Sequence, residues 1–170
     1  LASPVIANSP AFATEKEILF TKTFTRNLEE TTHQFPDIVE AANVQIDATS
    51  VILDGEAIGY NKETGKFLPF QETIQRKRKH GIADAAKQIP LKYMVFDILY
   101  LNGESLVDMP LIERRKLLDS IIKKGEVIVV DEYTKTEDAK VVAKESKDAL
   151  AKGLEGIMIK KVNSPYQAGA

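Results

Sequence analysis

The sequence has no cysteine, so disulfide bonds and thiolate metal sites are excluded. Its two histidines, His33 and His80, are too few for a multi-histidine zinc site. No apolar run is long enough to span a bilayer, and the opening LASPVIANSPAFAT lacks the basic start and continuous apolar stretch of a secretory signal. The P-loop, the Rossmann glycine pattern, HExxH and the nucleophile elbow are absent as well. We therefore expect a cytoplasmic protein whose chemistry uses other residues.

Positive and negative charges are nearly equal in number. The 170 residues carry a net charge of -2, with 44% hydrophobic and 28% charged residues. This composition is typical of one soluble globular domain and gives no global basic field for nucleic acid, although a local patch could supply one. The chain starts at Leu1 rather than methionine and stops at Ala170, just after a turn-like Ser-Pro. We therefore expect a fragment of a longer protein, with residues 1–14 as a loop or tail of uncertain origin.

Hydrophobic periodicity predicts strands and helices that intermix without strict alternation. Strands are predicted for residues 17–24, 49–60, 66–70, 91–101, 126–133 and 154–161. Helices are predicted from Pro36 onward, over 71–87, from 108 to a stop at Gly125, and over 136–152 with Thr136 as the cap. Asn102-Gly103 is the strongest hairpin signal. The pattern favours an α+β fold of largely antiparallel sheets flanked by helices.

Two acids interrupt the apolar stretch VILDGEAIGY at 51–60. Side chains alternate across a strand, so Asp54 and Glu56 point to the same face, where like charges repel unless a cation lies near them. Gly55 between them permits the close approach of a ligand or of another backbone. The simpler alternative is a strand end whose acids face water.

A third acid, Asp97, lies inside the most apolar segment, LKYMVFDILYL at 91–101. Burying a carboxylate is costly unless a partner satisfies it, and alternation puts Phe96 on the opposite face from Asp97. The alternative to a functional role is that Phe96 belongs to the core and that Asp97 accepts hydrogen bonds from backbone amides.

Two segments that contain lysines complete the set of candidates. In LEGIMIKK, at 154–161, Glu155 opens a predicted strand and Lys160 and Lys161 close it. This arrangement is typical of a solvent-exposed strand face, and it also suits a phosphate bound together with a metal. The other segment is a basic run that is typical of a solvated helix surface and is also the best candidate for contacts with a phosphate backbone. It consists of Arg76, Lys77, Arg78 and Lys79, followed by His80.

Five blocks in a fixed order carry a resemblance to a known family. They are FTRNLE at 24–29, FPDI at 35–38, ILDGE at 52–56, FDILYLNG at 96–103 and EGIMIK at 155–160. Together they resemble the adenylation domain of ATP-dependent DNA ligases, and PFQ at 69–71 followed by the basic run resembles the prokaryotic, archaeal-type branch. The resemblance implies that residues 15–170 form part of an ATP-grasp-like nucleotidyltransferase core.

In that family a lysine attacks ATP and holds AMP, which then passes to a DNA 5′-phosphate before the nick is sealed. The resemblance implies that Arg26 contacts the nucleotide, that Phe96 stacks on adenine, and that Glu56 lies by the AMP ribose. Glu56 and Glu155 would bind the metal. ATP and Mg²⁺ are the implied cofactors. Nicked double-stranded DNA is the implied partner of a monomeric enzyme of DNA replication, repair and recombination, with no membrane contact. The basic run and the pair Lys160 and Lys161 would contact phosphates.

The sequence departs from the family at the nucleophile. The family's lysine lies in a Lys-x-Asp-Gly motif upstream of Arg26, but residues 1–14 contain no lysine, and Lys16 and Lys22 lack the Asp-Gly context. The paired lysines expected beyond Tyr166 are also absent, as are the DNA-binding domain and the oligonucleotide-binding barrel. We therefore expect that this chain alone does not form the lysine–AMP adduct. An RNA ligase, a capping-type nucleotidyltransferase and a lysine-less nucleotide- or DNA-binding module remain as alternatives.

Overall fold

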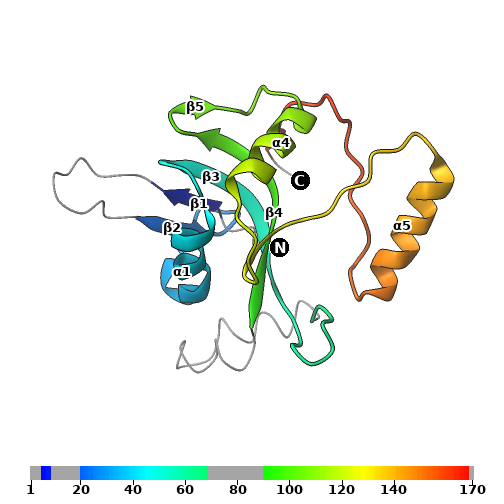
Figure 1. The fold of residues 1–170 in the computed structure, drawn as a ribbon, viewed down its shortest axis with the longest axis horizontal. Helices are drawn as coiled ribbons and strands as arrows, with labels where there is room; N and C mark the ends of the chain where they lie inside the picture. The colour runs from blue at the N-terminus through cyan, green and yellow to red at the C-terminus, as the bar shows by residue number, and fades with distance from the viewer. Residues whose placement is uncertain (1–4, 9–19, 69–89, 169–170) are drawn as a thin grey trace.

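The computed structural model of the chain describes residues 5–8, 20–68 and 90–168, with only the backbone for 5–8. Figure 1 shows a sheet with α1 and α4 beside it and with α5 standing apart. In chain order the elements are β1 (Val5–Asn8), β2 (Thr21–Phe24), η1 (Thr32–Gln34), α1 (Pro36–Gln45), β3 (Val51–Gly59), β4 (Leu91–Leu101), β5 (Glu104–Ser105), α4 (Leu111–Ile121), β6 (Ile128–Val130) and α5 (Ala139–Ala151).

The strands form one sheet in the order β2-β1-β3-β4-β5, and β6 also pairs with β4. All pairs along this path are antiparallel, whereas β6 runs parallel to β4. The predicted α+β class with a largely antiparallel sheet is therefore confirmed. The described residues form a single sheet rather than several.

The strand β1 lies where the sequence predicts a loop or tail. Ile6 is aligned with Thr23 of β2 on one side and with Leu53 of β3 on the other. The four residues VIAN, between two Ser-Pro breaks, are too few to show a period. The two neighbouring strands, which are distant in sequence, provide the ladder hydrogen bonds that this short segment needs.

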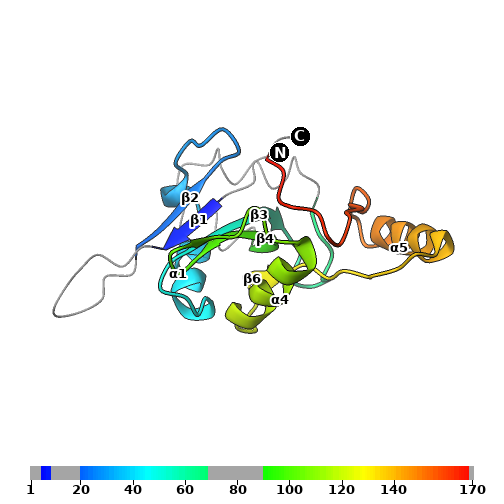
Figure 2. The ribbon, with the colours of Figure 1, turned by 90° about the horizontal axis from the view of Figure 1, so that it is seen from above.

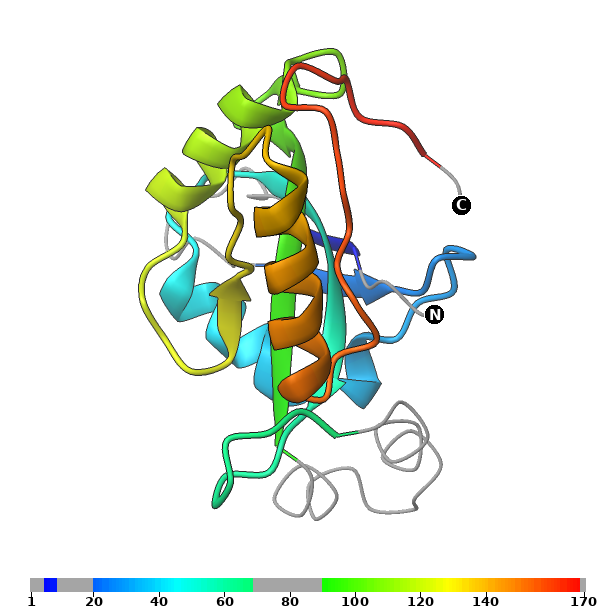
Figure 3. The ribbon, with the colours of Figure 1, turned by 90° about the vertical axis from the view of Figure 1, so that its right-hand side faces the viewer.

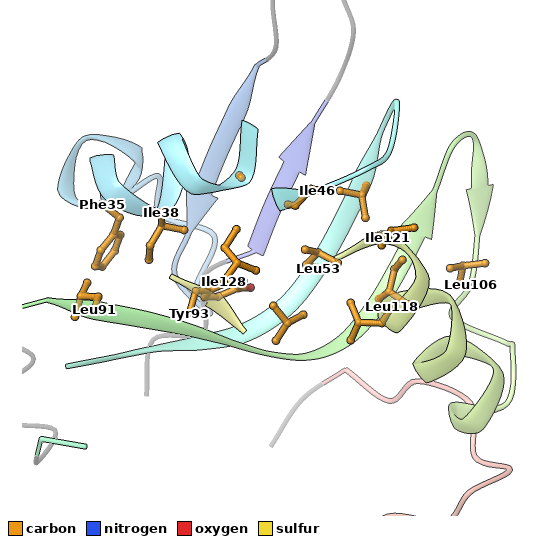
Figure 4. Close-up of a cluster of buried hydrophobic side chains, with 14 residues drawn as sticks. Phe35, Ile38, Ile46, Leu53, Leu91, Tyr93, Leu106, Leu118, Ile121 and Ile128 are labelled. Atoms are coloured by element: carbon orange, nitrogen blue, oxygen red, sulfur yellow. The ribbon is translucent and has the colours of Figure 1, made fainter. Parts of the chain in front are cut away.

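The hydrophobic core lies between the sheet and the helices α1 and α4, which cover the same face (Figure 2). Helix α1 begins at Pro36, as predicted, and buries Ile38 and Ala42 one turn apart. Helix α4 buries Leu118 and Ile121 in the same way. The sheet contributes Val51, Leu53, Leu91, Tyr93, Val95, Ile98 and Ile128 (Figure 4). Each large apolar side chain buried here contributes about 1.5–3 kcal/mol.

The long strands β3 and β4 pair along their whole length, from Val51 with Leu101 to Gly59 with Leu91. The predicted hairpin at Asn102-Gly103 is confirmed, because it joins β4 to β5 and both residues have positive φ, 47° and 101°. The side chain of Asn102 also accepts hydrogen bonds from the backbone N–H groups of Thr49 at 2.8 Å and Ser50 at 3.2 Å. The hairpin therefore also holds the start of β3.

Gln45, the last residue of α1, joins the helix layer to β6. Its Nε2 donates to the carbonyl oxygens of Ile128 at 2.8 Å and Lys123 at 3.1 Å, and its Oε1 accepts from the Ile128 N–H at 3.1 Å. A Cβ atom added at Gly125 would lie 2.2 Å from the Gln45 side chain. The prediction that Gly125 stops the helix is wrong, because α4 ends at Ile121. Gly125 instead leaves space for the Gln45 side chain.

Several boundaries differ from the predictions. Helix α4 and strand β6 are shorter than expected. Asp138 rather than Thr136 caps α5, because its side chain accepts from the Lys140 N–H at 2.8 Å while Thr136 accepts from the Asp138 N–H. Of the predicted strand at 66–70, residues 66–68 are described and provide a single bridge from Phe67 to Tyr60. The predicted helix over 71–87 lies outside the described residues.

The predicted strand at 154–161 is wrong. All eight residues are described, and none belongs to a strand. Met158 and Ile159 are 80% and 71% exposed, so the apolar run of this segment does not correspond to burial. A strand needs a neighbour for its ladder hydrogen bonds, and no described strand pairs with this segment. Figure 3 shows instead an extended trace that returns from the end of α5.

Candidate functional site

The face of the sheet turned away from α1 and α4 carries the predicted acids of β3. Leu53 is fully buried in the core, whereas Asp54 and Glu56 are half-buried. This difference is what alternation along a strand predicts. Glu56 is aligned with Met94 of β4. We call this side of β3 and β4 the open face.

Phe96 is the extra residue of a β-bulge in β4. Val95 is aligned with Gly55 and Asp97 with Asp54, which leaves Phe96 without an opposite residue. A bulge bends the strand and redirects the side chain. Phe96 is half-buried and does not belong to the side-chain cluster under the helices. The alternative in which Phe96 is plain core is therefore wrong, and an aromatic ring is left beside the acids of β3.

Glu56 and Glu155 interact through their charges. Burial raises the pKa of the Glu56 carboxyl above its ordinary value, and the negative charge of Glu155 raises this pKa further. Glu155 itself is exposed, in the extended segment after α5. The structure thus brings together two of the carboxylates that the sequence analysis selected. Within the described ranges no group of three or more His, Cys, Asp or Glu side chains gathers around a common point.

Replacing Glu56 with glutamine is expected to stabilise the chain at neutral pH. Because the pKa of Glu56 is raised in the folded state, its contribution is fully present below the ordinary value of 4.5 and is lost as pH rises through the higher folded value. Between about pH 4 and pH 7 the unmodified chain should therefore lose more stability than the Glu56→Gln variant. Urea unfolding at both pH values measures this difference. The same pH dependence in both proteins would contradict the expectation.

Tyr166 covers the other acid of β3. Its hydroxyl donates a hydrogen bond to Oδ2 of Asp54 at 2.9 Å, and its backbone N–H donates to the Val107 carbonyl at 2.7 Å. Burial and the charge of Asp54 raise the pKa of Tyr166 to about 12. The contact joins positions far apart in the chain, so no local sequence pattern indicates it.

Asp97 is satisfied by an arginine of α4 that the sequence analysis did not select. Nε of Arg114 donates to Oδ1 of Asp97 at 2.7 Å and Nη2 donates to Oδ2 at 2.9 Å. Both side chains are 2% exposed. The backbone amide predicted as a partner is present too, because the Ile98 N–H donates to Oδ1 at 2.9 Å. The available signal was the pair Arg114-Arg115 in the middle of an apolar helix stripe.

Arg26 is not brought into contact with these residues. It is exposed in the turn after β2, where the Thr25 N–H donates to the Glu29 carbonyl at 2.8 Å and Leu28 has a φ of 62°. β2 and β3 run in the same direction, because both are antiparallel to β1. Phe24 of β2 is aligned with Val5 of β1, and Leu53 of β3 with Ile6. Arg26, two residues after Phe24, therefore lies toward the same end of the sheet as Glu56, and its nucleotide contact stays a prediction.

The structure describes only some of the residues that are predicted to contact phosphates. Lys160 and Lys161 are exposed. Burial raises the pKa of the Asp131 carboxyl, and the nearby positive charge of Lys160 partly offsets this rise. Arg76, Lys77, Arg78 and Lys79 lie outside the described residues, so their role stays a prediction. Among the helices that the structure describes, none combines the length and the apolar character needed to cross a membrane.

The antiparallel sheet with helices on one face has the fold of ligase nucleotidyltransferase domains. The fold matches that of mycobacterial DNA ligase D, solved in complex with ATP and MES, with a TM-score of 0.67 over 99% of this chain and 48% of that chain at 23% identity. The ligase domain from M. tuberculosis LigD gives 0.64 over 98% and 47% at 22% identity. The chain belongs to the family of ATP-dependent DNA ligase domains, whose family model matches residues 16–170.

Curated relatives agree with this family. The probable DNA ligase of Dictyoglomus turgidum is 49% identical over 146 residues, which are 86% of this chain and 25% of that protein. The DNA ligase of Caldivirga maquilingensis is 42% identical over 151 residues, 88% of this chain and 25% of that protein. The chain thus spans about a quarter of the length of these relatives. The resemblance seen in the sequence is confirmed, and RNA ligases and capping enzymes are the less favoured alternatives.

Proposed function

We propose that this chain is part of an ATP-dependent DNA ligase that seals nicks in duplex DNA through enzyme–AMP and DNA-adenylate intermediates. The observation that supports it is the presence of Phe96, Glu56 and Glu155 around one open face in a chain of this family. The enzyme would act as a monomer in DNA replication, repair and recombination. The contributions of this chain are binding of the nucleotide, the metal and the DNA backbone.

The nucleotide would bind on the open face. Phe96 is half-buried outside the core cluster, so its ring is available to stack on adenine, an interaction worth about 1–3 kcal/mol by analogy with base stacking in nucleic-acid binders. Glu56 would accept hydrogen bonds from the ribose hydroxyls. Arg26, at the same end of the sheet, would contact the nucleotide with its positive charge.

Glu56 and Glu155 would hold Mg²⁺. Carboxylate oxygens are the hard ligands that this ion prefers, and a cation would offset the burial and the repulsion from Glu155 that together raise the pKa of Glu56. When bound, Mg²⁺ supplies positive charge that offsets the negative charge on the transferring phosphate. Because no third acid joins the pair among the described residues, phosphate oxygens and water would complete the coordination shell.

Contacts with DNA phosphates are proposed for the basic run of Arg76, Lys77, Arg78 and Lys79, and a phosphate contact for Lys160 and Lys161. Their support is the charge of these residues in a chain of this family. Binding through such contacts weakens with salt, with a log–log slope of about 0.9 per neutralised phosphate on B-DNA. A salt slope for nicked duplex that is unchanged when the four residues of the run become alanine would contradict their role.

The ATP affinity of the 170-residue chain tests the nucleotide site. Phe96→Ala is expected to weaken ATP binding about 5- to 150-fold, which corresponds to the loss of one stacked base. Isothermal titration calorimetry with Mg²⁺ present measures the dissociation constant. Phe20→Ala removes another aromatic ring, 48% exposed beside β2, and should leave affinity unchanged. Unchanged affinity in Phe96→Ala would remove this residue from the site.

The covalent step should not occur in this chain. No Lys-x-Asp-Gly motif is present, and Lys22, which lies in β2, is paired with Glu30 at 2.9 Å, an interaction that lowers the pKa of Glu30. Incubation with labelled ATP and Mg²⁺ is therefore expected to give no acid-labile AMP adduct. An adduct on any lysine of this chain would overturn that statement.

A further inference from the structure

Two consecutive arginines of α4 are buried where a helix normally packs apolar side chains. Arg114 and Arg115 are 2% and 6% exposed. Neighbouring positions on a helix point about 100° apart, so the two side chains reach different targets. A buried guanidinium is costly without partners, and the partners of both arginines include β4, at the adjacent residues Phe96 and Asp97.

Arg115 holds the backbone of Phe96. Its Nη1 donates to the Phe96 carbonyl oxygen at 3.0 Å and also to the carboxylate of Asp131, while Nη2 donates to the Asp131 carbonyl oxygen. The guanidinium lies 5.0 Å from the ring centroid of Tyr133. Arg115 thus connects Phe96 to the chain that follows β6.

Arg114 holds the next residue and a distant segment. In addition to its two hydrogen bonds with the Asp97 carboxylate, its Nη1 donates to the carbonyl oxygens of Met109 and of Ser164, the latter at 3.2 Å. The Ser164 carbonyl also accepts from the Leu111 N–H at 2.9 Å. The segment that carries Tyr166, and with it the hydrogen bond to Asp54, is therefore fixed to the same helix.

These contacts are made at the bulge, where pairing with β3 does not fix the backbone of Phe96. Phe96 has no opposite residue in β3, because the register continues from Val95 to Asp97 across the bulge. The direction of a bulged side chain depends on the local backbone geometry. Hydrogen bonds to the carbonyl of Phe96 and to the side chain of Asp97 fix this geometry from outside the ladder.

We propose that Arg114 and Arg115 are positioning residues for the nucleotide site: together they hold the bulge so that the Phe96 ring stays on the open face. This inference rests on the proposed function only in assigning the nucleotide to Phe96. The geometric part, that the arginines hold the bulge, is testable without any nucleotide.

Hydrogen exchange of the 170-residue chain tests the geometric part. Arg115→Lys keeps the charge, but one ammonium group does not reproduce the guanidinium fork to both partners. Faster exchange is expected in peptides that cover 94–99. Arg114→Lys, expected to speed exchange in 94–99 and in 162–166, gives the same readout if Arg115→Lys fails to fold. Lys116→Ala, an exposed position of the same helix paired with Glu113, should change neither region. Unchanged exchange at 94–99 in both lysine variants would overturn the inference.

A double-mutant cycle on ATP affinity tests the link to the nucleotide. Arg115→Lys is expected to weaken binding about three- to tenfold, less than the loss of about 5- to 150-fold for the whole stacking interaction in Phe96→Ala. In the Phe96→Ala background the same substitution should cost nothing further, because its effect acts through the ring. Equal losses in both backgrounds, or no loss in Arg115→Lys, would overturn the inference.

The outcomes separate this inference from the proposed function. No ATP binding by the unmodified chain, or unchanged affinity in Phe96→Ala, contradicts the nucleotide site and removes the nucleotide role of the arginines. If Phe96→Ala weakens binding while Arg115→Lys does not, the nucleotide site stands and the positioning role is wrong.

Discussion

The Asp97→Ala variant is expected to be less stable than the unmodified chain by about 3–5 kcal/mol, because it leaves a buried arginine charge without its partner. Arg114 and Asp97 are each 2% exposed and share two hydrogen bonds, so water cannot replace the carboxylate without opening the packing between α4 and β4. Urea unfolding followed by circular dichroism measures the loss.

The double variant Asp97→Leu/Arg114→Met is the informative control for this prediction. Removing both charges should cost less than Asp97→Ala alone, because buried ion pairs are often close to neutral relative to well-packed apolar residues. Asp97→Asn keeps an acceptor for the Ile98 N–H, so its loss of stability should lie between those of Asp97→Ala and the double variant. A loss below about 1 kcal/mol in Asp97→Ala would show that Arg114 finds water or another acceptor.

The Gly55→Ala variant should lose about 3 kcal/mol, the upper end of the usual cost of overpacking. A Cβ atom at this position would lie 2.4 Å from the Met94 carbonyl oxygen and 2.8 Å from Cζ of Tyr93. Tyr93 is fully buried, and the carbonyl belongs to the paired strand. Neither can move without separating β3 from β4, so thermal and urea unfolding should both detect the change.

Glu56→Gln is the matched control, because it changes the next residue of the same strand on the opposite face. It should raise stability at neutral pH, since the pKa of Glu56 is raised in the folded chain. If Gly55→Ala is as stable as the unmodified chain, the close approach at Gly55 does not constrain the sheet. The glycine of the ILDGE block would then need another explanation.

The parts of the fold that the sequence predicts are those that local periodicity specifies. The strands at 51–59 and 91–101 are long enough for their apolar pattern to be recognised in the sequence. Asn102-Gly103 is a turn sequence whose residues adopt the positive φ angles that the turn requires. The face on which Glu56 lies follows from alternation alone. The bulge that leaves Phe96 on the open face does not, because it depends on how β4 pairs with β3.

The errors and omissions concern partners that are distant in sequence. LEGIMIKK has a short apolar run typical of a strand, but such a run does not say whether a neighbouring strand exists, and Ile159 is 71% exposed. The sequence indicates that burial of Asp97 is costly without a partner, but that partner, Arg114, lies on another element 17 positions away. The proximity of Glu155 to Glu56 was expected from the family resemblance, not from any pattern in the residues.

The place of β4 in the sheet has a consequence for synthesis of the chain. β4 pairs with β3, β5 and β6, but residues 60–90 must be translated between β3 and β4. At about 5–20 residues per second this takes roughly two to six seconds. During that interval one edge of β3 has no partner, and an unpaired strand edge is a template for association with other chains. Until β4 is in place, Val51–Gly59 therefore has one edge open to association with another chain.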